Sequence, residues 1–142
     1  MSNVHTEILP ELQDEKAIEK ISIYYHALLV EDNFFTAHLT EKLLRKLGLF
    51  VTIASNGVEA IEAVYEKEFH IIFMDYHMPV MNGVEATKAI KALNHCKSQY
   101  IPIVALTAVL EREEFFQAGV DDYLCKPAKL ADIRTILERW LR

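Results

Sequence analysis

Short apolar runs recur along the chain, separated by segments with a different periodicity. They lie at His26–Val30, Phe50–Ala54, His70–Met74 and Ile101–Leu106, with a weaker run at Asp122–Cys125. Nearly unbroken apolar runs are typical of strands covered on both faces, so the first, third and fourth runs predict central strands of a parallel sheet. Between the runs, apolar residues recur every three or four positions, as in amphipathic helices. This alternation predicts an α/β fold with a doubly wound sheet of about five parallel strands and about five flanking helices.

Capping residues and apolar stripes delimit the predicted helices. Asn56 can cap one helix, with Glu59 reaching back from three residues later, and Asn82 with Glu85 repeats this pattern. Gly48 suits the left-handed position that ends the preceding helix. The stripes predict four buried helix faces, formed by Phe35, Leu39, Leu43, Leu44 and Leu47, by Val58, Ile61 and Val64, by Ala86, Ile90 and Leu93, and by Leu130, Ile133, Leu137, Trp140 and Leu141.

The first part of the chain differs in character from the rest. Residues 1–24 are rich in charge, and Pro10 suits the first turn of a short helix. We expect an N-terminal extension or linker there, with a helical segment as the alternative. A length of 142 residues is usual for one compact domain, so residues 25–142 are predicted to form a single domain.

Composition excludes several classes of function. A net charge of −6 and a pI near 5.5 argue against direct binding to the phosphate backbone of nucleic acids. The longest unbroken apolar stretch, Ala27–Val30, is far too short to cross a membrane, and the N-terminus lacks the basic region of a signal peptide. Cys96 and Cys125 form no disulfide or zinc pattern, and Cys125 is expected in the core. We therefore expect a cytoplasmic domain that makes no membrane contact itself.

Polar residues follow the predicted strands at the points where each strand ends. Glu31 and Asp32 follow the first strand, Asp75 the third and Lys126 the fifth, and Thr107 ends the fourth. In open parallel sheets the ligand site forms beyond the carboxyl ends of the strands, so these side chains are expected to converge.

The expected cluster indicates metal-assisted phosphoryl chemistry. Clustered carboxylates repel one another and favour a hard divalent cation between them, with the oxygen ligands that Mg²⁺ prefers. Asp75, at the end of a rigid central strand, is the natural nucleophile for a phosphoryl group, while Lys126 neutralises charge on the transferring oxygens. Thr107 can donate a hydrogen bond to the new phosphoryl group and draw its loop inward.

The sequence resembles the receiver domains of two-component response regulators, especially those attached to hybrid sensor histidine kinases. The resemblance runs from about residue 26 to residue 142, and its motifs occur in the family's order. They are Leu28-Leu29-Val30-Glu31-Asp32-Asn33, Ala54-Ser55-Asn56-Gly57-Val58-Glu59-Ala60, Met74-Asp75-Tyr76-His77-Met78-Pro79-Val80-Met81-Asn82-Gly83, Ile101-Pro102-Ile103-Val104-Ala105-Leu106-Thr107-Ala108 and Gly119-Val120-Asp121-Asp122-Tyr123-Leu124-Cys125-Lys126-Pro127.

This resemblance implies a fold and a phosphorelay function. The fold is the flavodoxin-like sheet with strand order 2-1-3-4-5, and Asp75 is implied to accept a phosphoryl group from a phosphohistidine on a histidine kinase or phosphotransfer domain. The implied ligands of Mg²⁺ or Mn²⁺ are Glu31, Asp32, Asp75 and the backbone carbonyl of His77.

The resemblance also implies roles for residues outside the metal site. Thr107 is the implied switch hydroxyl, Tyr123 the aromatic residue that moves with it and Lys126 the ammonium on the phosphoryl group, with a cis peptide before Pro127. A dimer that forms on phosphorylation fits the family, as does a place either in a stand-alone regulator or in a membrane-anchored hybrid kinase.

The segment from Thr107 to Gly119 departs from the family pattern. It is about three residues shorter than usual, close to one helical turn, so a shortened fourth helix region is expected. The acidic run Glu111–Glu114 is most simply a solvated helix start. His77 and Val109 each lie two residues beyond a site residue, and we hypothesise that they tune the lifetime of the phosphoryl group; the alternative is that His77 uses only its carbonyl.

Three other functions compete with a phosphoacceptor that is not itself an enzyme. A dehalogenase-like phosphatase would need a DxD motif after its first strand, and His77 stands where the second aspartate would follow Asp75. A flavin-binding module would need a phosphate loop where this chain has Glu31-Asp32-Asn33, whose charge repels phosphate. A receiver-like docking module that signals without phosphorylation remains the main alternative.

Overall fold

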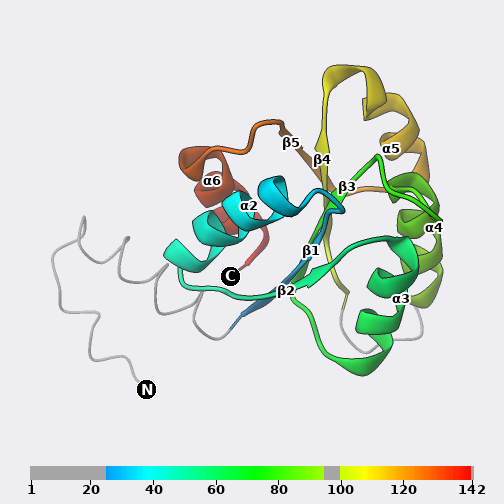
Figure 1. Ribbon diagram of the computed structural model, residues 1–142, viewed down its shortest axis with the longest axis horizontal. Helices are drawn as coiled ribbons and strands as arrows, with labels where there is room; N and C mark the ends of the chain where they lie inside the picture. The colour runs from blue at the N-terminus through cyan, green and yellow to red at the C-terminus, as the bar shows by residue number, and fades with distance from the viewer. Residues whose placement is uncertain (1–24, 95–99, 142) are drawn as a thin grey trace, which may run out of the picture.

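The computed structural model describes residues 25–94 and 100–141, so the extension predicted over residues 1–24 lies outside the described residues. A parallel sheet of five strands in the order β2-β1-β3-β4-β5 forms its centre, which confirms the predicted fold class (Figure 1). The strands start and end within one or two residues of the predicted positions. They are β1 (His26–Val30), β2 (Phe50–Ala54), β3 (Ile71–Asp75), β4 (Ile103–Thr107) and β5 (Asp122–Cys125).

Helices cover both faces of the sheet. Figure 1 shows α2 and α6 on one side and α3, α4 and α5 on the other. Their bounds are α2 (Phe34–Lys46), α3 (Gly57–Glu66), α4 (Gly83–Asn94), α5 (Arg112–Ala118) and α6 (Leu130–Trp140), with a 3-10 turn, η2 (Val109–Glu111), before α5. At 7 residues α5 is the shortest of these helices, in line with the shortened region expected there. Within the described ranges, none of the helices combines the length and hydropathy that a bilayer crossing requires.

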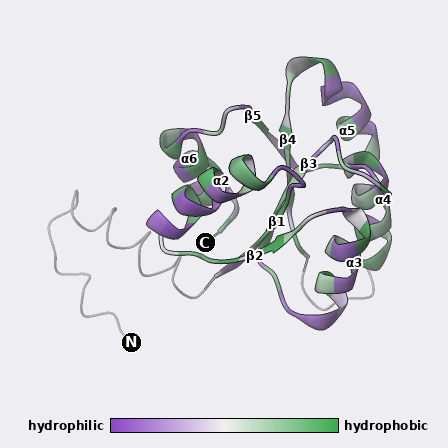
Figure 2. Ribbon diagram, viewed as in Figure 1, coloured by the Kyte–Doolittle hydropathy of each residue, from purple (hydrophilic) through white to green (hydrophobic). Residues whose placement is uncertain are grey.

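Alternate residues of the central strands pack into two separate cores. Leu29 and Phe73 face α2 and α6, whereas Leu28, Ile72 and Met74 face α3, α4 and α5. All residues of β3 and β4 are buried, and Figure 2 shows hydrophobic strands between helices that mix hydrophobic and hydrophilic residues. The unbroken apolar runs of the sequence are explained by this burial on both faces.

Local capping follows the sequence prediction. Asn56 Oδ1 accepts from Glu59 N at 2.9 Å, and Glu59 Oε1 accepts from Ser55 N at 2.8 Å. The Asn82 and Glu85 pair repeats this reciprocal arrangement before α4, at 2.9 and 3.0 Å. These caps satisfy N–H groups that have no partner within their helices.

Four side chains that were predicted to be buried are exposed. Phe35 and Leu39 are 79% and 65% exposed, because α2 packs through Ala37, Thr40 and Leu44 instead. These apolar side chains therefore form an outer face.

Val58 and Cys125 are the other two exceptions. Val58 is 37% exposed, since α3 is turned to bury Gly57, Ala60 and Val64. Cys125 is exposed, and it is the last residue of the edge strand β5.

Gly83 allows α4 to begin directly against β3. Its N–H donates to Tyr76 O at 2.9 Å, and a Cβ at this position would lie 1.9 Å from the carbonyl oxygen of Asp75.

We predict that Gly83→Ala lowers the free energy of unfolding by about 2 kcal/mol, because either α4 or the end of β3 must shift. Urea denaturation measures the loss, with Gly119→Ala as a control whose cost comes only from its left-handed backbone (φ 99°). A loss for Gly83→Ala smaller than that of the control would contradict the close approach.

His26, the first residue of β1, links the stability of the fold to pH. Its Nε2 lies 2.8 Å from Thr52 Oγ1, and its ring packs against Phe69. Burial lowers the pKa of His26 below its ordinary value of 6.5, and the positive charges of Lys67, His70 and Arg45 lower it further. Protonation therefore favours the unfolded state, so the contribution is complete above about pH 6.5 and is lost as the pH falls below that value.

The corresponding prediction compares unfolding of the wild type and His26→Gln between about pH 5 and pH 7.5. The wild type should lose stability more steeply toward low pH than the variant. Parallel curves would show that His26 is not linked to folding.

Candidate acidic site at the carboxyl end of the sheet

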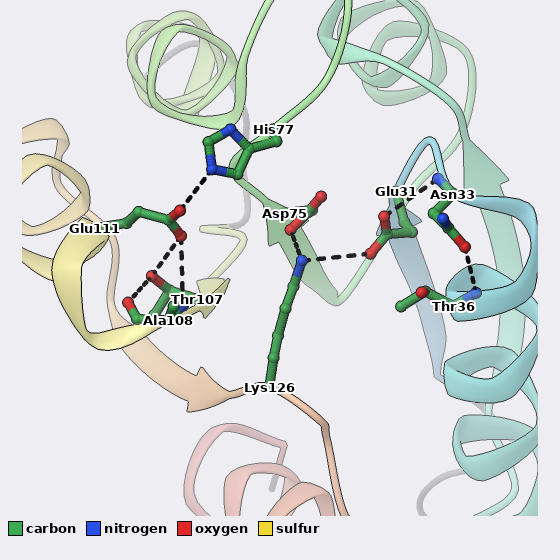
Figure 3. A network of polar contacts seen from close by, with 9 residues as sticks. All are labelled: Glu31, Asn33, Thr36, Asp75, His77, Thr107, Ala108, Glu111 and Lys126. Atoms are coloured by element: carbon green, nitrogen blue, oxygen red, sulfur yellow. Dashed lines mark hydrogen bonds and ion pairs between the residues drawn. The ribbon is translucent and has the colours of Figure 1, made fainter.

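The strand order places the predicted polar residues at one edge of the sheet. Val30 pairs with Met74 across β1 and β3, and Asp75 pairs with Leu106 across β3 and β4. The residues that end or follow these strands are thus level with one another. The structure brings together Glu31, Asp32, Asp75 and Lys126, with Thr107 on the neighbouring strand end. Figure 3 shows these side chains, except that of Asp32.

The three carboxylates form a compact cluster. One oxygen from each of Glu31, Asp32 and Asp75 lies within 4.8 Å of the others. Glu31 and Asp75 are almost fully buried, at 3% and 2% exposure, whereas Asp32 is exposed. Burial raises the pKa of Glu31 to about 7, and the nearby charge of Asp75 raises it as well. The cluster therefore resists holding its negative charge without a cation.

Lys126 supplies the positive charge that the structure provides for this cluster. Its Nζ forms an ion pair with Asp75 Oδ1 and lies 3.9 Å from Glu31 Oε1. Figure 3 shows the side chain reaching from the end of β5 to a point between these carboxylates. The Lys126–Pro127 peptide is cis, as expected, and Lys126 N donates to Thr107 O at 3.2 Å. β5 is thereby joined to β4 at the site.

The donor set fits a divalent cation such as Mg²⁺. Among the described residues, the buried oxygens Glu31 Oε1 and Asp75 Oδ1 accept no hydrogen bond from a protein donor and meet only the charge of Lys126. One ammonium cannot balance three carboxylates, and all the free donor atoms are hard oxygens. The backbone carbonyl of His77 stays a predicted ligand.

Thr107 is held away from the acidic cluster. Its side chain is completely buried, yet Oγ1 donates to Ala108 O at 2.6 Å or to Glu111 Oε1 at 3.1 Å. A hydroxyl has one proton, so it serves one of these acceptors at a time. The hydroxyl that is expected to meet a phosphoryl group thus has other partners in this structure.

Glu111 is the site residue that the sequence did not reveal. Its Oε2 lies 2.7 Å from His77 Nε2, while its Oε1 accepts from Thr107 and from Ala108 N. The predicted solvated helix start is confirmed for Arg112, Glu113 and Glu114, which are exposed in the first turn of α5, but only 19% of the Glu111 side chain is exposed. One of its contacts could have been predicted from the sequence. Glu111 follows Ala108 by three residues, and a Glu at that spacing can accept a hydrogen bond from the N–H of the residue that starts the turn.

Tyr123 connects β5 to the start of α5. It is half-buried on β5, its hydroxyl donates to Arg112 O at 3.3 Å, and the Arg112 guanidinium lies 5.3 Å from its ring centre. Burial raises the pKa of Tyr123, so the phenol keeps its proton. Its role as a switch stays a prediction, as does that of Val109, whose side chain lies outside the described atoms.

Comparison with known proteins places this site in a family. Residues 27–138 match the model of the response regulator receiver domain. Hybrid signal transduction histidine kinase B of Dictyostelium discoideum is 40% identical in an alignment of 128 positions that covers 82% of this chain and 6% of that kinase. The chain thus spans a small part of the length of such relatives.

Two solved structures resemble the chain closely. The receiver domain of sensor histidine kinase PA1611 from Pseudomonas aeruginosa is 40% identical, with a TM-score of 0.74 over 82% of this chain and 96% of that one, and its site cleft is described as holding a magnesium ion. The Saccharomyces cerevisiae receiver domain of Ssk1, crystallised with the histidine phosphotransfer protein Ypd1, is 33% identical, with a TM-score of 0.75 over 82% and 88% of the two chains. With its sheet order, its acidic edge and these matches, the chain belongs to the response regulator receiver domains.

Proposed function

We propose that Asp75 accepts a phosphoryl group from a phosphohistidine on a histidine kinase or phosphotransfer protein. The observation that carries this proposal is the buried Asp75 carboxylate, which lies beside Lys126 at the end of a rigid strand. In the transfer, a bond forms between phosphorus and an Asp75 oxygen while the bond between phosphorus and the imidazole nitrogen breaks. The nitrogen keeps the electron pair and takes up a proton.

Glu31, Asp32 and Asp75 would hold Mg²⁺, or Mn²⁺, together with the His77 carbonyl. When bound, the ion supplies positive charge for the oxygens of the transferring group. The shared donor chemistry of the cluster and the magnesium ion described for the related PA1611 domain support this assignment.

The remaining site residues act on the phosphoryl group after it arrives. Lys126, now paired with Asp75, can turn to a phosphoryl oxygen without leaving the site, because about a third of its side chain (36%) is exposed. Thr107 would donate its hydroxyl to another oxygen, and Tyr123 would follow the Thr107 loop. The domain would serve as a signalling acceptor in the cytoplasm and not as an enzyme; phosphorylation-dependent dimerisation and the lack of nucleic-acid contact stay predictions.

The exposed apolar face of α2 is the proposed docking surface for the phosphohistidine protein. Phe34, Phe35 and Leu39 are between 65% and 79% exposed. Leu39 also lines a groove of about 340 Å³ that extends past Pro127 to Glu31 and Lys126. A partner seated on α2 would therefore lie beside the acceptor. The receiver domain of Ssk1, a relative, was crystallised in complex with the histidine phosphotransfer protein Ypd1.

The acceptor proposal predicts a single labelled residue. Incubation with acetyl phosphate and Mg²⁺ should add one phosphoryl group to the wild type, and the intact mass measures it. Asp75→Asn should gain none, whereas the control Asp132→Asn, on the exposed start of α6, should be labelled like the wild type. Removing the metal with EDTA should stop labelling. An unlabelled wild type would favour the docking module, and a labelled Asp75→Asn would move the acceptor elsewhere.

The docking proposal predicts that the two phosphoryl donors respond differently to Leu39→Asp. Transfer from phosphorylated Ypd1 at low concentration should slow roughly tenfold, since a charge replaces an apolar contact. Labelling by acetyl phosphate, which needs no docking surface, should not change. Phe116→Asp is the matched control, because Phe116 is 66% exposed on α5. Equal slowing by the two variants would argue against a docking surface on α2.

A further inference from the structure

One carboxylate outside the acidic cluster bonds to both loops that border the acceptor. Glu111, at the end of η2, contacts the His77 ring from the loop after β3 and Thr107 with Ala108 from the end of β4 (Figure 3). The distances are 2.7 Å to His77, 3.1 Å to Thr107 and 3.3 Å to Ala108 N. Removal of this single side chain would therefore break one link between the two loops.

The simplest role for Glu111 is to cap η2. Its bond to Ala108 N is the reciprocal half of a capping box, and Glu111 N donates back to Ala108 O at 3.2 Å. Capping does not explain the other contacts, because neither the Thr107 hydroxyl nor the His77 ring is a helix-end N–H group. These contacts bear on the phosphoryl site itself.

The charge of Glu111 opposes the movement expected of Thr107. The hydroxyl has one proton, and a carboxylate is a stronger acceptor than a neutral oxygen. On phosphorylation that proton would have to pass from the neighbourhood of Glu111 to a phosphoryl oxygen. A hydroxyl between two anions can satisfy only one of them, so Thr107 must give up its bond to Glu111 in order to donate to the phosphoryl group.

A second contact joins the same two segments. Tyr76, the residue after Asp75, donates its hydroxyl to Glu114 Oε1 at 2.9 Å, and its ring packs edge-on against Phe115. Both residues that follow the acceptor are thus tied to carboxylates at the start of α5. Withdrawal of Glu111 would pull on the end of α5 that is nearest the site.

We propose that Glu111 is a positioning residue that holds Thr107 in its resting place and is displaced when Asp75 carries a phosphoryl group. This inference rests on the proposed function. It makes Glu111 a determinant of how readily the phosphorylated arrangement forms, through its effect on Thr107.

Beryllofluoride, which mimics a phosphoryl group on an aspartate, provides the test in the presence of Mg²⁺. Glu111→Gln keeps an oxygen that can cap Ala108 but loses the charge, so it should bind beryllofluoride roughly fivefold more tightly than the wild type. Glu113→Gln is the matched control, because it removes the same charge two residues further along the chain, in the first turn of α5. Among the described residues, the Glu113 carboxylate bonds to Gln117 and not to Thr107 or His77. Its affinity should equal that of the wild type.

A double-mutant cycle separates positioning from a structural effect. In a Thr107→Ala background, the gain from Glu111→Gln should disappear, since Glu111 then has no hydroxyl to hold. An unchanged affinity for Glu111→Gln, or the same gain with and without the Thr107 hydroxyl, would overturn the inference while leaving the acceptor proposal intact. A wild-type protein that binds no beryllofluoride would instead overturn the proposed function and this inference together.

Discussion

Mutual repulsion of carboxylates at the end of the sheet is the constraint on which the site depends. Glu31 and Asp75 are buried within 4.8 Å of each other and of Asp32, and a single ammonium lies between them. Such an arrangement costs stability in the folded protein, as the raised pKa of Glu31 indicates. A cation or a phosphoryl group changes the charge balance at once. The interactions within the site therefore depend on whether a cation or a phosphoryl group is bound.

The rest of the fold keeps these charges in place. Strands β3 and β4 are buried on both faces by two apolar cores, so the positions of Asp75 and Thr107 are fixed at the backbone. The loops beyond them are joined mainly by polar contacts, such as those of Glu111 with His77 and Thr107. Polar contacts exchange partners at lower cost than a packed core rearranges. A change at Asp75 can thus alter these polar contacts without disturbing the sheet.

The sequence predicted well wherever one local signal decided the structure. Unbroken apolar runs predicted the buried strands, and the Asn and Glu pairs predicted the helix starts. It failed where an apolar residue could face either the core or the solvent. Leu39 fits the helical stripe of α2, yet Thr40 on the next position is buried in its place. Cys125 was predicted to be buried because it lies in a strand, but it is the last residue of an edge strand and is exposed.

The sequence by itself determined the fold class, the strand order through its family resemblance, and the polar residues that follow the strands. The fold class and the polar residues at the strand ends follow from periodicity and from chain order, whereas the strand order follows only from the resemblance. Only the tertiary structure decided which face of α2 lies outward and that Glu111 bonds to both His77 and Thr107. Glu111 and His77 are 34 residues apart, and their contact depends on where α5 packs against the sheet. How separate elements pack depends on the whole chain, so local sequence patterns do not predict such contacts.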